Sequence, residues 1–143
     1  MFTIHKRLRA FSAAHRLIKG YTGKCRDLHG HNYSLEVTLT AETLDQYDFV
    51  IDFDAIKAHL DTWVQDHWDH ATLISAADHK LLAFIQQENQ SYFVIPGEHN
   101  TTAERLAEFL FHQFTDILKP LFKAVKLTEV RVYESETAWA SYQ

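Results

Sequence analysis

The only cysteine of the chain lies among three histidines, between residues 15 and 31. His15 comes first, Cys25 follows, and His29 and His31 flank a single glycine. Alternate residues of an extended strand point to the same face, about 7 Å apart, so His29 and His31 can bind one ion. Three neutral imidazoles that leave a fourth position open are a recurrent catalytic zinc arrangement, whereas structural sites fill all four positions. The spacing therefore predicts a zinc site made by His15, His29 and His31.

Cys25 has two interpretations beside such a site. A free cysteine is usually a small buried hydrophobe, but its neighbours here, Lys24 and Arg26, are basic. These charges and a nearby Zn²⁺ would favour the thiolate, which can act as a base or a nucleophile at neutral pH. In the other interpretation, Cys25 is the fourth ligand and the zinc site is structural. The spacing alone leaves both open.

Three carboxylates outside this cluster are further candidates. In Asp69-His70 the aspartate can orient the histidine for proton transfer. Glu134 ends an apolar strand and can accept two parallel N–H bonds, which suits the ring edge of guanine or a pterin, unless it is simply an exposed strand end. Glu104 stands three residues after Thr101, the spacing of a helix capping box.

Composition limits the classes of protein that the chain can represent. Its 143 residues suit one domain, 1–143, and its single cysteine excludes an internal disulfide. The first residues lack the apolar run of a signal peptide, so we expect a cytoplasmic protein. No stretch approaches the roughly 18 apolar residues of a membrane helix, and we expect no membrane partner.

The net charge of -5 hides an uneven distribution of charge. Residues 1–26 contain seven of the fourteen Lys and Arg residues and no Asp or Glu. This segment is either a solvated strand and loop or an attraction site for an anionic ligand. The basic side chains nearest to the histidines are Arg16, Lys19, Lys24 and Arg26. The segment matches no nucleic-acid-binding motif and the domain is acidic, so we expect no nucleic acid partner.

Alternation of apolar and polar residues predicts the strands that carry these groups. Residues 2–10 read as one half-buried strand, and residues 29–40 as a second that follows a turn at residues 20–24. Shorter elements follow the same reasoning. They are a helix over residues 79–89 and strands over residues 92–95, 125–133 and 137–142.

Two longer segments show helical periodicity. From the expected N-cap Asp52, apolar residues recur at three- and four-residue spacing as far as His67. A second helix begins near Thr101, carries an apolar stripe from Ala103 to Ile117, and ends at Pro120. Two helices between early and late strand pairs predict an α+β fold rather than a parallel β/α arrangement.

Together, these motifs resemble the 6-pyruvoyl-tetrahydropterin synthase family over nearly the whole chain. The resemblance rests on Phe11-Ser12-Ala13-Ala14-His15-Arg16-Leu17, Cys25, His29-Gly30-His31, Val50-Ile51-Asp52-Phe53, Asp69-His70, Thr102-Ala103-Glu104, Glu134 and Trp139-Ala140. Three residues separate Cys25 from His29. This gap is similar to that of the bacterial branch, 6-carboxy-5,6,7,8-tetrahydropterin synthase of queuosine and deazapurine biosynthesis, because the pyruvoyl-forming branch has a longer gap.

The resemblance implies a fold and an assembly. The tunnelling fold of this family is an antiparallel four-stranded sheet with two helices packed on one face. Subunits form a barrel, as a trimer or a dimer of trimers, with active sites between subunits. We therefore expect a homo-oligomer.

The resemblance also implies residue roles and a reaction. His15, His29 and His31 would bind Zn²⁺, Cys25 would be the general base, Asp69 and His70 of a neighbouring subunit would relay protons, Glu134 would anchor the pterin, and Thr102 and Glu104 would contact it. The implied lyase converts 7,8-dihydroneopterin triphosphate to 6-carboxy-5,6,7,8-tetrahydropterin, releasing acetaldehyde and triphosphate, and Lys24 and Arg26 would face the triphosphate.

Some residues depart from the family pattern, and other functions remain possible interpretations of the sequence. Thr101, Trp68 and Ser135-Glu136 replace residues that are frequent in the family, which leaves the substrate open. The alternatives are 6-pyruvoyl-tetrahydropterin synthase activity, or a non-enzymatic pterin-binding module stabilised by a closed zinc site. A cupin oxygenase, suggested by His29-x-His31 and Glu36, is disfavoured by the two helices.

Overall fold

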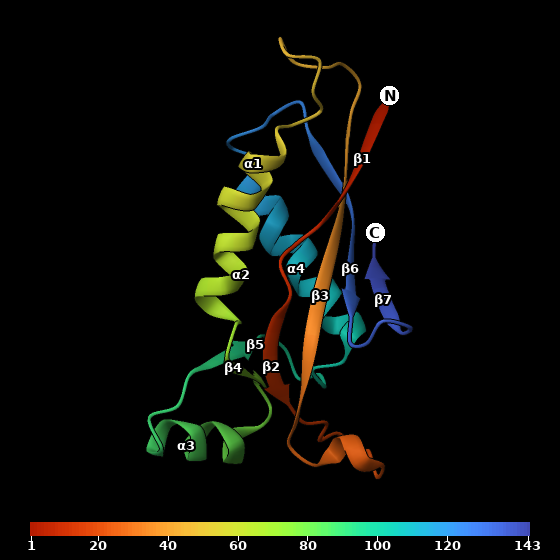
Figure 1. The fold of residues 1–143 in the computed structure, drawn as a ribbon. Helices are drawn as coiled ribbons and strands as arrows, with labels where there is room; N and C mark the ends of the chain where they lie inside the picture. The colour runs from red at the N-terminus through yellow and green to blue at the C-terminus, as the bar shows by residue number, and fades with distance from the viewer.

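The longest strand, β3 (His29–Ala41), organises the fold in the computed structural model, which describes residues 1–143 (Figure 1). One edge of β3 pairs with β1 (Phe2–Arg7) and β2 (Phe11–His15), and the other edge pairs with β6 (Lys126–Tyr133), all in antiparallel fashion. The other strands are β4 (Ala71–Ser75), β5 (Tyr92–Ile95) and β7 (Trp139–Tyr142). The sheet has seven strands in the order β5-β4-β2-β3-β6-β7, with β1 paired to β3.

The expected single strand over residues 2–10 is wrong, because it is interrupted. β1 ends at Arg7 opposite Glu36, and β2 begins at Phe11 opposite Tyr33. Three residues on this side, 8–10, therefore face only two residues of β3. An extra residue of this kind makes a bulge, which disrupts the pairing and bends the strand.

This bulge changes which residues face the core. Leu8, the first residue of the bulge, is buried, and the buried residues after the bulge are odd-numbered. These are Phe11, Ala13 and His15. Within the bulge, the amide of Arg9 donates to Asp61 Oδ1 at 2.7 Å. The bulge therefore turns the side chain of His15 toward the interior.

The expected four-stranded antiparallel sheet is too small. β1, β3, β6 and β7 are antiparallel neighbours, but β4 pairs in parallel with both β2 and β5, so the sheet is mixed. Sequence periodicity did not reveal β4. All five of its residues are buried, and a strand covered on both faces shows no alternation of polar residues.

Two long helical segments cover one face of the sheet, as expected (Figure 1). α1 (Phe53–Ile56), a π-helical turn (Lys57–Asp61) and α2 (Thr62–His67) follow one another without a break. Asp52 caps this segment, since its side chain accepts from the Asp54 amide at 2.8 Å. The second segment, α4 (Ala103–Leu118), ends before Pro120. The shorter α3 (His79–Gln87) lies beside β4 and β5.

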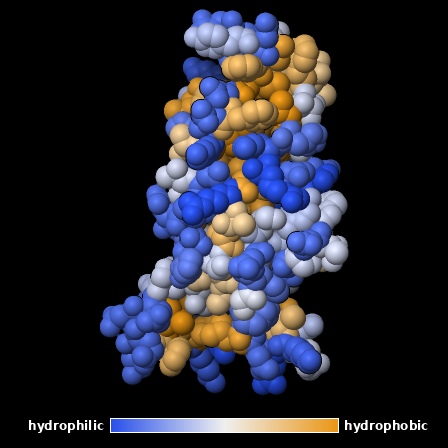
Figure 2. Space-filling view, in the orientation of Figure 1, coloured by the Kyte–Doolittle hydropathy of each residue, from blue (hydrophilic) through white to orange (hydrophobic).

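The core lies between this face of the sheet and the two helical segments. Fully buried side chains come from β3, from the helix that follows Asp52, from α4 and from β6. Among them are Leu35, Leu39, Ile56, Leu60, Leu106, Leu110, Phe114 and Val130. No helix is long and apolar enough to cross a membrane. Three exposed aromatic side chains, Phe2, Phe49 and Phe53, line one hollow at the end of β3 that is far from His29. Hydrophobic surface is visible in the upper part of the molecule (Figure 2).

Candidate metal centre and its cavity

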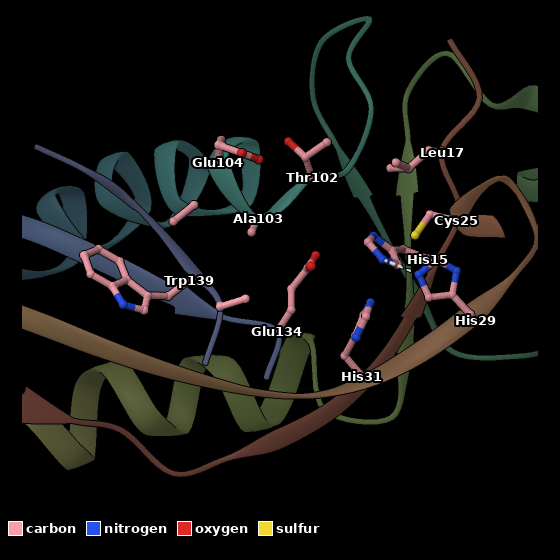
Figure 3. A pocket seen from close by; sticks show the side chains of 12 residues that line it. His15, Leu17, Cys25, His29, His31, Thr102, Ala103, Glu104, Glu134 and Trp139 are labelled. Atoms are coloured by element: carbon pink, nitrogen blue, oxygen red, sulfur yellow. Dashed lines mark hydrogen bonds between the residues drawn. The ribbon is translucent and has the colours of Figure 1, made fainter. Parts of the chain in front are cut away.

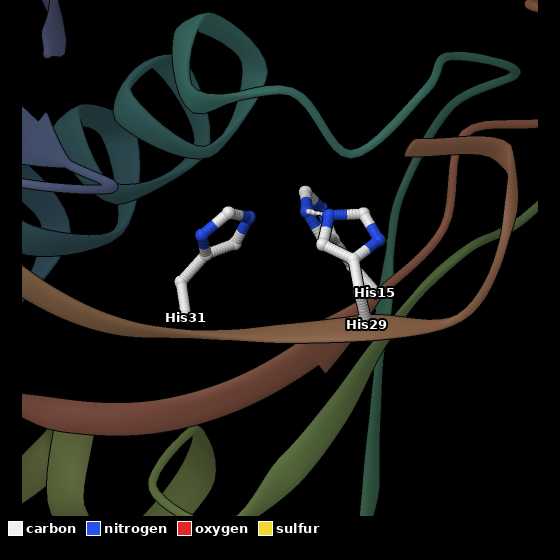
Figure 4. Close-up of side chains that lie close together, drawn as sticks. All are labelled: His15, His29 and His31. Carbon is white, nitrogen blue, oxygen red and sulfur yellow. Dashed lines mark hydrogen bonds between the residues drawn. The ribbon is translucent and has the colours of Figure 1, made fainter. Parts of the chain in front are cut away.

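The three predicted metal ligands meet at the end of the sheet where β3 begins (Figure 4). His15 on β2 lies directly opposite His29 on β3, and His31 is two residues further along the same strand. The ring centroids are 4.6 Å apart for His15 and His29, 5.2 Å for His15 and His31, and 4.9 Å for His29 and His31. One nitrogen from each ring lies within 4.8 Å of the others. The structure therefore brings together the trio that the sequence predicted.

Backbone carbonyls orient two of these rings. The Nδ1 atom of His15 lies 2.7 Å from the carbonyl oxygen of Thr101, and Nδ1 of His29 lies 2.7 Å from that of Asp27. A carbonyl only accepts, so each Nδ1 carries the proton and each Nε2 holds a lone pair. These two Nε2 atoms face each other at 3.0 Å. In the neutral pair, this contact places two lone pairs together with no proton between them.

His15 is neutral at physiological pH. It is 2% exposed, and its burial lowers its pKa to about 4. The hydrogen bond to Thr101 opposes this shift, and the nearby His29 and His31 add to it. Its lone pair therefore remains available until the pH falls well below 6. Metal ligation requires this unprotonated form of imidazole.

The donor set fits a divalent metal ion. Metal–imidazole bonds of about 2.1 Å at a tetrahedral angle place two nitrogens about 3.4 Å apart, and a cation between them removes the repulsion of their lone pairs. A metal-binding histidine usually donates the hydrogen of its other ring nitrogen to a carbonyl or a carboxylate, which fixes the orientation of the ring. The sulfur of Cys25 is not part of the cluster of ligand atoms. The arrangement thus offers three protein ligands and an open position.

A cavity of about 270 Å³ opens onto the histidines (Figure 3). Its walls come from five separate parts of the chain, and they include seven of the residues predicted from the sequence. Those seven are His15, Cys25, His29, His31, Thr102, Glu104 and Glu134. Leu17, Ala103, Ala138, Trp139 and Ala140 complete the lining. Cys25 is half-buried and lies on a 3₁₀ turn (Lys24–Arg26) beside His29.

Glu134 points into this cavity because of its place after β6. Val130 and Val132 face the core, and continued alternation brings Glu134 to the same face. Its amide donates to the carbonyl of Ala138 at 3.2 Å, which closes the turn into β7. The side chain is half-buried and makes no hydrogen bond within the chain. Its carboxylate is therefore free to accept from a ligand.

The N-terminus of α4 forms the opposite wall, where the predicted capping box does not form. Thr102, not Thr101, is the N-cap, and its hydroxyl accepts from the Arg105 amide at 3.5 Å. Thr101 is completely buried and faces His15 instead. Glu104 lines the cavity in the first turn of the helix, where the helix dipole favours negative charge.

The basic residues expected to attract an anion do not line the cavity. Lys24 and Arg26 are exposed on either side of Cys25, on the turn at its rim. Arg16 is engaged elsewhere, since its Nε lies 2.6 Å from Asp78 Oδ2 in an ion pair. The hydrogen bond from Arg16 lowers the pKa of Asp78, so this pair stays charged.

The Asp69-His70 pair forms as expected but lies outside this cavity. His70 Nδ1 is 3.0 Å from Asp69 Oδ1, and the Ser12 amide donates to the same oxygen at 3.1 Å. Burial would raise the pKa of Asp69, but these two hydrogen bonds and the charges of His70 and Arg9 together lower it. His70 lines a different hollow and its side chain is 82% exposed. Its backbone φ of 62° is left-handed, which is uncommon for a non-glycine residue.

Sequence reasoning missed the groups that orient the ligands. The carbonyls of Thr101 and Asp27 carry no residue-type signal, because every residue has a carbonyl. Trp139 and Ala140 appeared only within a motif. Nothing in their residue types places them in the same cavity as the histidines.

The chain is similar to one protein family over nearly its whole length. A family profile described as 6-pyruvoyl tetrahydropterin synthase matches residues 3–143. A 6-carboxy-5,6,7,8-tetrahydropterin synthase from Rickettsia bellii is 33% identical over 128 residues, covering 87% of this chain and 88% of the relative. One from Haemophilus influenzae is 30% identical, covering 100% and 99%.

The fold is also found among solved structures. The 6-pyruvoyl tetrahydropterin synthase of Plasmodium vivax superimposes with a TM-score of 0.75, covering 99% of this chain and 98% of that one. The two sequences are 20% identical, so this similarity concerns the fold. The comparison of function rests on the more similar relatives from Rickettsia bellii and Haemophilus influenzae.

We expect His29→Ala to lose the bound metal. After loading with Zn²⁺ and dialysis, the unsubstituted chain should retain about one ion per chain, and the variant should retain almost none, because only two imidazoles remain. The measurement is metal content by mass spectrometry. His112→Ala, on the exposed side of α4, is the matched control. Equal metal content in the two variants would contradict the site.

Proposed function

Because the chain belongs to the 6-pyruvoyl tetrahydropterin synthase family, we propose that it is a zinc-dependent lyase that forms 6-carboxy-5,6,7,8-tetrahydropterin. The substrate is 7,8-dihydroneopterin triphosphate, and acetaldehyde and triphosphate are released. The enzyme acts in the cytoplasm, in queuosine and deazapurine biosynthesis. The observation that carries this proposal is a single cavity that joins three imidazoles, a thiol and an unpaired carboxylate.

Glu134 anchors the pterin ring in this proposal. A carboxylate accepts two parallel N–H bonds from an amidine-like ring edge, and such charge-assisted pairs are stronger than neutral ones. Glu134 is suited to this role because it points into the cavity and has no partner within the chain. Thr102 and Glu104 contact the same ring from the N-terminus of α4.

Cys25 is the general base. It shares the cavity with the three histidines but is outside the cluster of ligand atoms, which supports a separate role. When bound, Zn²⁺ supplies Lewis acidity at the side-chain oxygens of the substrate and makes the adjacent C–H bond more acidic. The Cys25 thiolate removes the proton from that carbon as the general base.

Asp69 and His70 serve the cavity of a neighbouring copy of the chain. Their own cavity does not include them, and the exposed side chain of His70 is available to a partner. Asp69 orients the imidazole and stabilises its charged form, which suits proton transfer to the substrate side chain. A barrel-shaped homo-oligomer, as a trimer or a dimer of trimers, supplies the required neighbour.

Lys24 and Arg26 attract the triphosphate. They flank Cys25 at the rim and have no ion-pair partner in the chain, whereas Arg16 is neutralised by Asp78. Their position outside the cavity suits a charged tail that extends from a bound pterin into solvent.

A second candidate activity is 6-pyruvoyl-tetrahydropterin formation, in which triphosphate is eliminated and the side chain is kept. The name of the family profile favours it. The names of the relatives from Rickettsia bellii and Haemophilus influenzae favour the carboxy product. The short gap between Cys25 and His29 also favours the carboxy product.

The products formed from 7,8-dihydroneopterin triphosphate distinguish these activities. With the zinc-loaded protein we expect acetaldehyde and a 6-carboxypterin, because the proposed chemistry cleaves the side chain. Both are identified by mass spectrometry, with metal-free protein as the control. A 6-pyruvoyl product would establish the second candidate, and absence of any pterin product would exclude both.

Replacing Cys25 with alanine tests its role as the base. We expect Cys25→Ala to keep its metal and fold but to lose about 10²- to 10⁴-fold in kcat, the usual contribution of a general base. Turnover, metal content and circular dichroism are the measurements. Thr22→Ala, in the same exposed loop, should behave as the unsubstituted protein. Loss of metal from Cys25→Ala would instead make the cysteine a ligand of a closed, structural site.

Replacing Glu134 with glutamine tests the pterin anchor. We expect Glu134→Gln to weaken biopterin binding about 10- to 100-fold, because the amide cannot accept two N–H bonds with a full negative charge. Calorimetry gives the affinity, and metal content should not change. Glu136→Gln, two residues away and exposed, is the control. Unchanged affinity in Glu134→Gln would remove this residue from the anchor role.

A further inference from the structure

The segment that carries Cys25 has few contacts of its own with the rest of the chain. Residues 19–24 are exposed, and Gly20 has a left-handed φ of 67°. The hydrogen bonds within the segment are local, such as that from the Gly20 amide to the carbonyl of Ile18 at 2.8 Å. A loop of this kind opens readily unless its ends are fixed.

One backbone hydrogen bond connects Cys25 to the chain that leaves β2. The amide of Leu17 donates to the carbonyl of Cys25 at 2.9 Å. Leu17 lies two residues after His15, and both side chains line the cavity. The position of Cys25 therefore depends on the path of residues 16–19.

Asn100 fixes that path from a distant part of the sequence. Its Oδ1 accepts from the amides of Ile18, at 2.7 Å, and Lys19, at 3.0 Å. The next residue, Thr101, accepts from His15 through its carbonyl. Two adjacent residues before α4 thus hold the metal-binding histidine and the start of the cysteine loop.

We propose that Asn100 is a positioning residue for Cys25. Its side-chain oxygen holds residues 18 and 19, so the Leu17–Cys25 hydrogen bond keeps the thiol beside the metal cluster. This inference rests on the proposed function, in which Cys25 is the general base. Asn100 does not line the cavity, so it acts through the loop.

We expect removal of the Asn100 side chain to displace Cys25 but to leave the metal site intact. The His15–Thr101 hydrogen bond uses the backbone of Thr101, so it does not need the Asn100 side chain. A base displaced by about 1 Å can slow a reaction by as much as 10²-fold. Without the Asn100 side chain, the Arg16–Asp78 ion pair and the Leu17–Cys25 hydrogen bond remain, but residues 18 and 19 lose their partner.

The test compares Asn100→Ala with Asn100→Asp and with Gln87→Ala, an exposed amide on α3. In zinc-loaded Asn100→Ala, we expect alkylation of Cys25 by iodoacetamide to be about fivefold faster, because two hydrogen bonds that oppose opening are gone. We expect kcat to fall about 10-fold or more while KM changes less and zinc content stays the same. Asn100→Asp keeps an acceptor for both amides and should restore both values, and Gln87→Ala should change neither.

Two measurements do not depend on turnover. Hydrogen exchange of the unsubstituted protein should show protected amides at Ile18 and Lys19, although Lys19 is exposed. In Asn100→Ala, protection should be lost over residues 16–26 and kept in β3. Exchange at the rate of an open loop in the unsubstituted protein, or an unchanged alkylation rate in Asn100→Ala, would overturn the proposal. If the unsubstituted protein forms no pterin product, the proposed function fails, whereas these two measurements still report on Asn100.

Discussion

The bulge between β1 and β2 is the constraint on which the candidate metal centre depends. A strand alternates its side chains between two faces, so one extra residue exchanges the faces for everything that follows. Residues 8–10 oppose two residues of β3, and His15 then shares the buried face with His29 and His31. If residues 8–10 continued the regular alternation of β1 instead of forming the bulge, the imidazole of His15 would point to the opposite face, where Ser12 and Ala14 lie. The Arg9 amide, which leaves the ladder at this point, is satisfied by the buried carboxylate of Asp61.

The cavity forms where several elements end, and this explains its mixed chemistry. β2 ends at His15, β3 begins at His29, β6 ends just before Glu134, and α4 begins just after Thr102. The ends of elements leave backbone groups without regular partners. Two such carbonyls orient imidazoles here. Burial keeps His15 neutral, while the nearby helix N-terminus favours the negative charge of Glu104.

The predicted catalytic groups lie in two separate places on the chain. The histidines, Cys25 and Glu134 share one cavity. His70, which contacts Asp69, lines a second hollow that also includes Ser12, Asn32 and the far side of His31. One chain therefore does not contain a complete set of the proposed groups in one place. In a symmetric assembly, the surface that carries His70 can complete the cavity of a neighbour.

The sequence by itself determined the ligand types, the helices and most strands, because these depend on local spacing. His29-Gly30-His31 identifies one face of a strand, and Asp52 and Pro120 mark helix ends. The tertiary structure alone decided the break at residues 8–10, the parallel pairing of β4, the capping by Thr102 and the separation of His70 from Cys25. It also decided that Asn100 and Thr101 hold the ends of the site. These features depend on contacts between residues far apart in the chain and on backbone groups common to all residues, neither of which leaves a local pattern in the sequence.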